Sequence, residues 1–246
     1  MRIIISPAKK MTVDNDSFSH NQLPKFINRT EELLSHLKSL TYDELKKIWK
    51  ASDKIATLNY ERIQEMDLRK NLTPAILAYE GIQYQYMASG VLETEQYTYL
   101  EQHLRILSGF YGILKPFDGV TPYRLEMQAK LKHEAYPSVY AFWGEQLAHT
   151  LFNETDTIIN LASEEYSKTI TKYNTDAKII RCKFGELQDG KVKEKGTLVK
   201  MARGEMVRFM AENQVQTPEK LKVFNHLDFA FSDEHSTENE YVFIKG

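Results

Sequence analysis

Arg124 and Glu126 stand two residues apart in the stretch YGILKPFDGVTPYRLEM, which covers residues 111 to 127. Side chains with this spacing share a face on a β-strand but diverge on a helix. On a strand, the carboxylate of Glu126 could hold the guanidinium of Arg124 in place for a phosphate, or it could transfer a proton itself. A plain structural ion pair is the alternative to both roles.

Further polar side chains follow predicted strands or separate predicted helices, where loops often carry functional groups. They occur in four stretches: Ser6 to Lys10, Ser52 to Lys54, Asn160 to Tyr166, and Lys200 to Arg203. If the fold gathers their cations, arginine suits bidentate contacts to phosphate and lysine acts as a point charge. The residues predicted to bind phosphate or DNA are Lys9, Lys54, Arg124, Lys168, Lys200, Arg203 and Arg208. Ordinary capping and solvation is the alternative for each stretch taken alone.

Other catalytic and metal-binding patterns are absent from the sequence. It contains no P-loop, dinucleotide fingerprint, HExxH motif or nucleophile elbow. Glu126 and Glu165 are the candidate catalytic residues for acid–base chemistry, beside Arg124 and Lys9. We predict no cofactor and no metal site, and the acids and histidines of residues 226 to 235 are the available ligands for direct iron binding.

The single cysteine, Cys182, lies between Arg181 and Lys183 in a predicted strand. The two cations could lower the pKa of its thiol, but a buried, inert thiol is the favoured interpretation. One cysteine cannot form a disulfide within the chain, which fits a reducing compartment.

The composition is that of an ordinary globular protein, with 246 residues, 42% hydrophobic and 27% charged residues, and a formal charge of −2. The apolar runs are too short to span a bilayer, so we expect a cytoplasmic protein with no membrane partner. The charge is uneven, because nine Lys or Arg and four Asp or Glu lie between Lys178 and Arg208. Such a segment marks either an anion-binding face or a solvated one.

Hydrophobic spacing and capping residues predict the elements that would position these side chains. Strands are predicted at residues 2–5, 157–162, 177–183, 197–201 and 240–245. Helices are predicted at residues 28–40, 41–51, 55–66, 95–107, 138–152 and 202–213, with others beginning at 163 and 217. The elements are interspersed without regular alternation or a linker. This favours an α+β fold, with one domain over residues 1–246 and a mixed or antiparallel sheet surrounded by helices.

Residues 123–132 present a conflict between propensity and pattern. The segment from Leu125 to Lys130 consists of good helix formers, and Pro122 suits a helix start. However, apolar and polar residues alternate with a period of two, which is the stronger signal. We therefore predict a strand with Arg124 and Glu126 on one polar face.

Several of these stretches, taken in order, are those of a known family. SPAK, SDK, LSGFYGILKPFD, PYRLEM, FWG, NLASEEY and ARG follow one another from the first strand onward. In this series the chain resembles the peroxide stress protein YaaA family. The resemblance extends over essentially the whole chain.

The resemblance implies a cytosolic bacterial protein that helps cells resist hydrogen peroxide, in connection with iron homeostasis and oxidative damage to DNA. It also implies DNA binding, a positively charged cleft and a helix-hairpin-helix-like element, but no established reaction. Residues 41–66 or 108–112 could supply the hairpin, and the first has more helix. The leading hypothesis is a DNA-binding stress protein without enzymatic activity. The alternative is an enzyme acting on a phosphorylated or nucleic-acid substrate.

Overall fold

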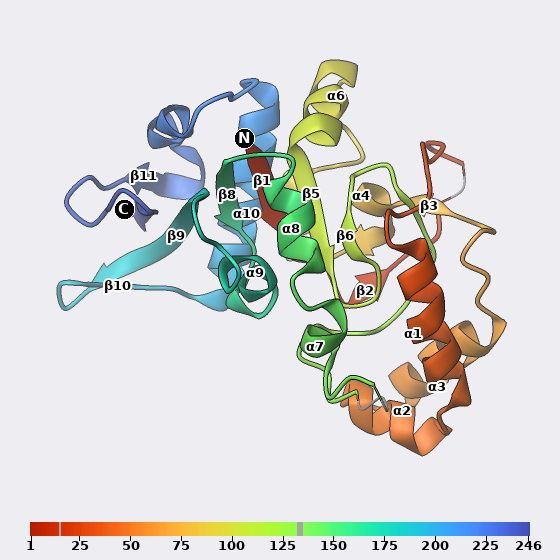
Figure 1. Ribbon diagram of the computed structural model, residues 1–246. Coiled ribbons are helices and arrows are strands. Elements are labelled where there is room, and N and C mark those ends of the chain that lie inside the picture. Colours follow the sequence, from red (N-terminus) through yellow and green to blue (C-terminus); the bar gives the residue numbers. More distant parts are fainter. Residues whose placement is uncertain (15, 132–134) are drawn as a thin grey trace.

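A computed structural model describes residues 1–14, 16–131 and 135–246, and a central sheet organises the fold (Figure 1). Within these residues the sheet has eight strands, seven of them in the order β11-β12-β9-β8-β1-β5-β6, with β10 paired to β9. The strands are β1 (Arg2–Ile5), β5 (Leu104–Ser108), β6 (Gly112–Leu114), β8 (Thr157–Leu161), β9 (Lys178–Gln188), β10 (Lys191–Lys193), β11 (Phe229–Phe231) and β12 (Glu240–Lys245).

The middle of the sheet is parallel. Strand β1 pairs in parallel with β5 and β8, and β9 pairs in parallel with β8 and β12. Antiparallel pairs occur where β6, β10 and β11 join the sheet. The expected mixed sheet is therefore confirmed, whereas the antiparallel alternative is wrong. Parallel strands are covered on both faces, and accordingly Ile3, Ile4 and Ile5 are fully buried.

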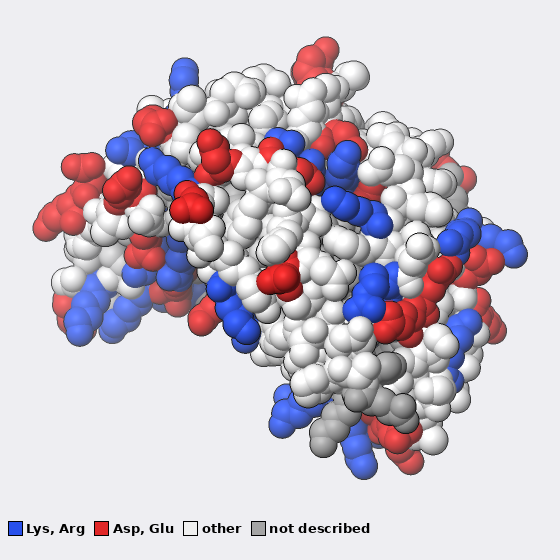
Figure 2. Space-filling view, viewed as in Figure 1, with Lys and Arg blue, Asp and Glu red and all other residues white. Residues whose placement is uncertain are grey.

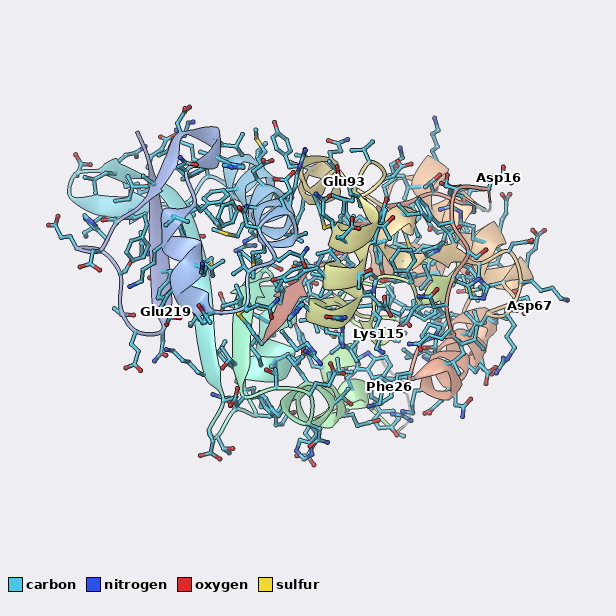
Figure 3. The ribbon with its side chains drawn as sticks, turned by 90° about the horizontal axis from the view of Figure 1, so that it is seen from above. Asp16, Phe26, Asp67, Glu93, Lys115 and Glu219 are labelled. Carbon is cyan, nitrogen blue, oxygen red and sulfur yellow. The ribbon has the colours of Figure 1, made fainter. Side chains whose placement is uncertain are left out.

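Helices cover both faces of this sheet (Figures 1 and 3). On one side lies α10 (Gly196–Glu212), which packs against α5 (Ile82–Met87) and α6 (Thr94–His103). On the other side lie α8 (Gln146–Phe152) and α9 (Glu164–Thr171), with α7 (Val139–Trp143) nearby. One hydrophobic cluster joins the sheet to both layers.

A second group of helices lies beyond β6, at the lower right of Figure 1. It consists of α1 (Ile27–Ser39), α2 (Tyr42–Trp49) and α3 (Asp53–Glu65). The predicted capping box of α2 is confirmed, because Thr41 and Glu44 bond each other's backbone N–H. Residues 50–52 join α2 to α3, with Lys50 in the left-handed conformation at φ 46°. A DNA-binding role for this pair, as a helix-hairpin-helix-like element, stays a prediction.

Short elements complete the chain. They are β2 (Lys10–Met11), β3 (Thr73–Pro74), α4 (Ala75–Ala78), β4 (Tyr79–Glu80), β7 (Gly119–Val120) and the 3₁₀ helices η1 (Pro218–Val223) and η2 (His226–Asp228). Strand β2 pairs with β4, and β3 pairs with β7. In the described part of the chain, no helix is long and apolar enough to cross a membrane.

Three predicted elements are corrected by the structure. Residues 197–201 are not a strand but part of α10, because Val199 and Ala202 extend the buried stripe of that helix to Met206. The helix predicted at 95–107 ends at His103 and continues as β5, whose apolar residues pair with β1. The helix predicted at 138–152 is divided by Gly144, which has φ 52°.

The strand predicted over residues 123–132 is also wrong, although its alternation is real up to residue 131; residue 132 lies outside the described residues. Tyr123, Leu125 and Met127 are buried, whereas the side chains between them are less so. Residues 123–126 belong to no helix or strand, and a turn follows in which the backbone N–H of Ala129 donates to the carbonyl oxygen of Glu126 at 3.0 Å. The segment pairs with no strand among the described residues. Instead of pairing with a strand, the segment packs closely against Gly109. A Cβ placed on Gly109 would lie 2.5 Å from the carbonyl oxygen of Leu125.

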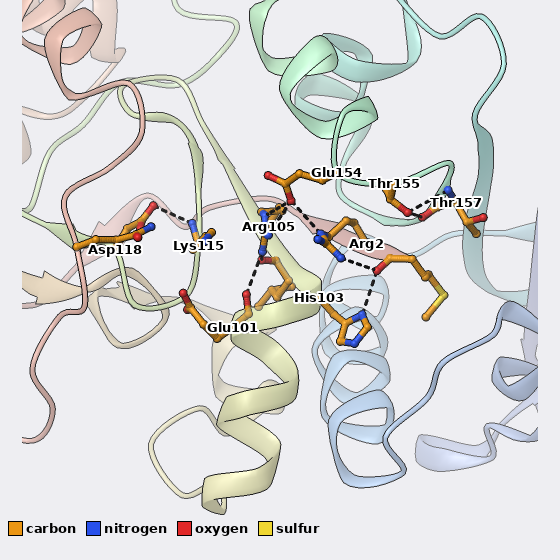
Figure 4. A network of polar contacts seen from close by, with 12 residues as sticks. Arg2, Glu101, His103, Arg105, Lys115, Asp118, Glu154, Thr155 and Thr157 are labelled. Carbon is orange, nitrogen blue, oxygen red and sulfur yellow. Dashed lines mark hydrogen bonds and ion pairs between the residues drawn. The ribbon is translucent and has the colours of Figure 1, made fainter.

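Ion pairs hold the amino ends of the central strands (Figure 4). Glu154, which follows α8, accepts hydrogen bonds from Arg2 Nε at 2.8 Å and Arg105 Nε at 2.9 Å. Burial by itself would raise the pKa of Glu154, but these two guanidinium groups lower it below the ordinary value. The amino edge of the sheet is thus joined to the end of α8 through Glu154. The candidate site described below lies at the opposite, carboxyl edge.

Candidate functional site at the carboxyl edge of the sheet

The parallel strands reverse their order between β1 and β8. In chain order, the five parallel strands are arranged 2-1-3-4-5, since β5 lies on one side of β1 and β8, β9 and β12 lie on the other. Open parallel sheets bind ligands beyond the carboxyl ends of their strands at such a reversal. The fold therefore directs attention to the loops that follow β1 and β8.

A cavity of about 440 Å³ opens at this position, and we call it the β1–β8 cavity. Its walls come from residues 6–10 after β1, residues 80–84 around the start of α5, the extended segment 123–126, the beginning of α9, and Lys200 and Arg203 of α10. Segments far apart in the sequence thus meet at one site. Its volume lies within the roughly 300–1,000 Å³ typical of small-ligand sites.

Hydrogen bonds between the two strand ends form the floor of this cavity. The hydroxyl of Ser6 accepts from the backbone N–H of Ser163 at 2.9 Å and lies 3.2 Å from its hydroxyl. The hydroxyl of Tyr84 donates to the carbonyl oxygen of Ser6 at 2.9 Å. The two serines therefore have a structural role, because their hydrogen bonds join the end of β1 to the end of β8.

Arg124 and Glu126 do lie side by side, as the alternation predicted. Glu126 Oε1 is 3.5 Å from Arg124 Nη2 and 3.0 Å from Lys9 Nζ. Lys9 is largely exposed, so its pair with Glu126 contributes at most about 1 kcal/mol. Glu126 therefore orients two cations at the wall of the β1–β8 cavity.

Glu165 approaches the same cavity from the first turn of α9. Its Oε1 accepts from the backbone N–H of Gln128 at 3.1 Å. Burial and, to a smaller extent, the nearby charge of Glu126 raise the pKa of Glu165 above its ordinary value, against the opposing effects of the Gln128 hydrogen bond and of Lys9. A half-buried carboxyl with a raised pKa is a candidate acid or base.

Three buried nitrogen donors at this cavity have no hydrogen-bond partner within the described residues. They are Arg124 Nε, Arg203 Nε and Gln83 Nε2. The pKa of Arg203 is lowered by burial and by the neighbouring Arg181. Because an unsatisfied buried donor costs about 1–3 kcal/mol, three at one cavity need acceptors from water or from a ligand that enters it.

Four of the seven predicted basic residues line the β1–β8 cavity: Lys9, Arg124, Lys200 and Arg203. The other three do not. Lys54 is exposed on α3, Lys168 lies 4.1 Å from the ring centre of Tyr140, and Arg208 pairs with Glu212 at 2.7 Å. Together with Lys10, the lining has five Lys or Arg against three Glu, a formal charge of +2.

Sequence reasoning missed Gln83 and Glu80. Gln83 is 6% exposed and Glu80 pairs with Lys10 at the rim of the cavity. Nothing in the run GIQYQYM distinguishes Gln83 from its exposed neighbour Gln85 as a lining residue. Its position depends on α5 packing against α10, where Gly204 leaves room for the carbonyl oxygen of Gln83.

Two other candidate sites have structural roles. Cys182 has no exposed surface, and burial raises the pKa of its thiol to about 12. His226 Nδ1 lies 2.9 Å from Glu205, and His235 Nδ1 lies 2.8 Å from Ser232 Oγ. Across the described residues, no three His, Cys, Asp or Glu side chains are grouped to hold a metal ion.

Sequence comparison identifies the family of the chain. Residues 1–235 match the family described as Peroxide stress protein YaaA. The chain belongs to the peroxide stress protein YaaA family. This membership connects it with the stress response to hydrogen peroxide.

Relatives of this YaaA family member are similar over their full length. A UPF0246 protein of Pediococcus pentosaceus is 52% identical over all of this chain and 98% of its own length. UPF0246 proteins of Lachnoclostridium phytofermentans and Desulfitobacterium hafniense are each 55% identical over all of this chain, covering 97% and 98% of their own lengths.

The charges of this YaaA family member are mixed on the face shown in Figure 2. Lys and Arg alternate with Asp and Glu over the described part of that face, without a continuous basic surface. The positively charged cleft expected from the resemblance is therefore not seen as a broad surface there. Of the buried guanidinium Nε atoms without a partner among the described residues, those of Arg124 and Arg203 are at the β1–β8 cavity and that of Arg29 is not.

Proposed function

We propose that this protein acts in the peroxide stress response by binding DNA in the cytoplasm, with phosphate held by Lys9, Arg124, Lys200 and Arg203. The observation that carries the proposal is the pair of buried, unpartnered Nε donors of Arg124 and Arg203 at one cavity. Guanidinium groups bind phosphate oxygens through paired N–H donors, and Lys200 is exposed at the same wall.

The mixed overall charge is compatible with this function, because the local field governs the approach of a polyanion. Lys9 and Arg124 are already oriented by Glu126, so a phosphate would meet donors with little freedom left to lose. Four phosphate contacts predict a slope of about −3.6 for the logarithm of affinity against the logarithm of salt concentration. Little dependence on base sequence is expected from such contacts.

The test compares two double variants that each remove two positive charges. Lys200→Gln with Arg203→Gln alters the cavity, whereas Lys172→Gln with Lys220→Gln alters exposed cations that neither line it nor belong to α2 and α3. Affinity for a labelled duplex is measured by fluorescence anisotropy across a salt series. The first pair should weaken binding and reduce the salt slope by about 2, whereas the control should change neither by comparable amounts. Equal behaviour of the two pairs, or binding insensitive to salt, would refute the proposal.

A second function is favoured by Glu165. Its half-buried carboxyl has a raised pKa and shares the cavity with Arg124 and Arg203. We infer as the alternative an enzyme that acts on a phosphorylated or nucleic-acid substrate, with Glu165 or Glu126 as acid or base. The test is turnover of a panel of nucleotides and DNA, followed for wild type, Glu165→Gln and Glu126→Gln. Turnover that both variants retain unchanged would remove these residues from the mechanism.

A further inference from the structure

The β1–β8 cavity contains recognition groups that a bare phosphate would not use. Gln83 is 6% exposed, and its Nε2 is one of the three unpartnered buried donors. An amide group does not carry the charge that attracts phosphate, but it suits the edge of a nucleobase. Because the unpartnered atom is a donor, its complement is an acceptor such as purine N7 or a base carbonyl oxygen.

Three aromatic rings line the same cavity. Tyr84, Tyr123 and Tyr166 are 4%, 5% and 7% exposed and all three line the cavity. Two of them are held by hydrogen bonds, since Tyr84 donates to Ser6 and the Tyr123 hydroxyl lies 2.6 Å from Ser108 Oγ. Rigid aromatic walls of this kind provide surface on which a base can stack.

The cationic groups are contributed by other walls of the same cavity. Arg124 comes from the extended segment and Lys200 and Arg203 from α10, whereas Gln83 comes from α5. The volume of about 440 Å³ suits a small ligand, while specific contact with a DNA duplex needs a surface of roughly 1,000 Å² or more. A polar amide, aromatic walls and guanidinium donors together match one base, its sugar and its phosphate.

We propose that the β1–β8 cavity binds a single nucleotide, with the phosphate at Arg124 and Arg203 and the base edge at Gln83. The inference rests on the proposed function for its phosphate-binding residues and adds a base-binding part to the same site. The nucleotide has two sources, a free nucleoside monophosphate or one nucleotide turned out of a DNA strand, since both present the same chemistry.

The first experiment measures free ligands by isothermal titration calorimetry. The four deoxynucleoside 5′-monophosphates are compared with the matching nucleosides and with inorganic phosphate. At least one monophosphate should bind about tenfold more tightly than either of its parts. Gln83→Met should weaken that monophosphate about tenfold and leave inorganic phosphate unchanged, which also shows that the variant is folded. Gln85→Met, on the exposed side of the same helix, is the matched control and should behave as wild type.

The second experiment identifies the source with three duplexes: fully paired, containing one unpaired nucleotide, and containing an abasic residue at that position. Tighter binding of the unpaired nucleotide, lost in the abasic duplex and in Gln83→Met, supports a nucleotide turned out of DNA. Equal binding of the three duplexes together with tight monophosphate binding supports a free nucleotide.

The inference is overturned if no monophosphate binds more tightly than inorganic phosphate and the three duplexes bind alike. It is also overturned if Gln83→Met and Gln85→Met are indistinguishable in both experiments. Neither result affects phosphate-directed DNA binding, which is judged by the salt slope of the fully paired duplex. Loss of the slope with retained monophosphate binding would instead refute the DNA function alone.

Discussion

Gly109 is the position at which one added methyl group should displace the candidate site. A Cβ there would lie 2.5 Å from the carbonyl oxygen of Leu125, 2.9 Å from the carbonyl carbon of Glu126 and 3.0 Å from the nitrogen of Met127. All three are backbone atoms, so no flexible side chain can rotate away. Ordinary contact begins near 3.4 Å, and Gly109→Ala must therefore move the segment that carries Glu126 by about 0.9 Å.

The energetic cost follows from two opposing effects. Overpacking a well-packed interior destabilises by about 1–3 kcal/mol. Replacing glycine by alanine also restricts the unfolded chain, which stabilises by about 0.4–1 kcal/mol. A net loss of about 1.5 kcal/mol corresponds to a fall in Tm of roughly 3–6 °C for a chain of this length.

The assay is thermal unfolding followed by circular dichroism, with Gly196→Ala as the matched control. A Cβ on Gly196 meets nothing within 4 Å, so this variant should melt within about 1 °C of wild type or slightly higher. Affinity for duplex DNA should also fall in Gly109→Ala, because Arg124 and Glu126 are attached to the displaced segment. A Tm for Gly109→Ala no lower than that of the control would show that residues 125–127 do not pack as described.

Two further predictions concern buried titratable groups. Burial raises the pKa of Asp118 to about 6. A carboxyl whose pKa is raised in the folded state contributes its full stabilisation below its ordinary pKa. This stabilisation is lost as the pH rises through 6. Between pH 4 and pH 7, the free energy of unfolding of wild type should therefore fall by about 2 kcal/mol relative to that of Asp118→Asn. Urea unfolding of both proteins across this pH range measures the difference. A difference that stays constant with pH would contradict the prediction. The thiol of Cys182 should react slowly with iodoacetamide at pH 8 until the protein is unfolded, and Cys182→Ala should keep protection against peroxide. Rapid labelling of the folded protein would contradict its burial.

Local pattern in the sequence was sufficient for part of the site. Alternating polarity predicted that Arg124 and Glu126 share a face, and strand ends followed by polar residues identified Lys9 and Glu165. Arg203 was identified from a predicted strand end that is in fact part of α10. The capping box at Thr41 was equally readable, because its hydrogen bonds join residues only three apart. These features depend only on residues that are close together along the chain, so the sequence by itself is sufficient to predict them.

Tertiary contacts decided the secondary structure of two of the predicted strands. Alternation predicts which side of residues 123–131 is buried, but packing on Gly109 took the place of a partner strand. Residues 197–201 became helix because their apolar side chains complete the stripe of α10. In both segments a contact distant in sequence overrode the local preference.

The β1–β8 cavity itself could not be predicted from the sequence. It exists because β1 and β8, more than 150 residues apart, pair in parallel at the reversal of strand order. That pairing brings Ser6 to Ser163, and the packing of α5 on α10 brings Gln83 near Arg203. The sequence determined which side chains were available for chemistry, whereas the free energy of packing between distant segments determined which of them meet.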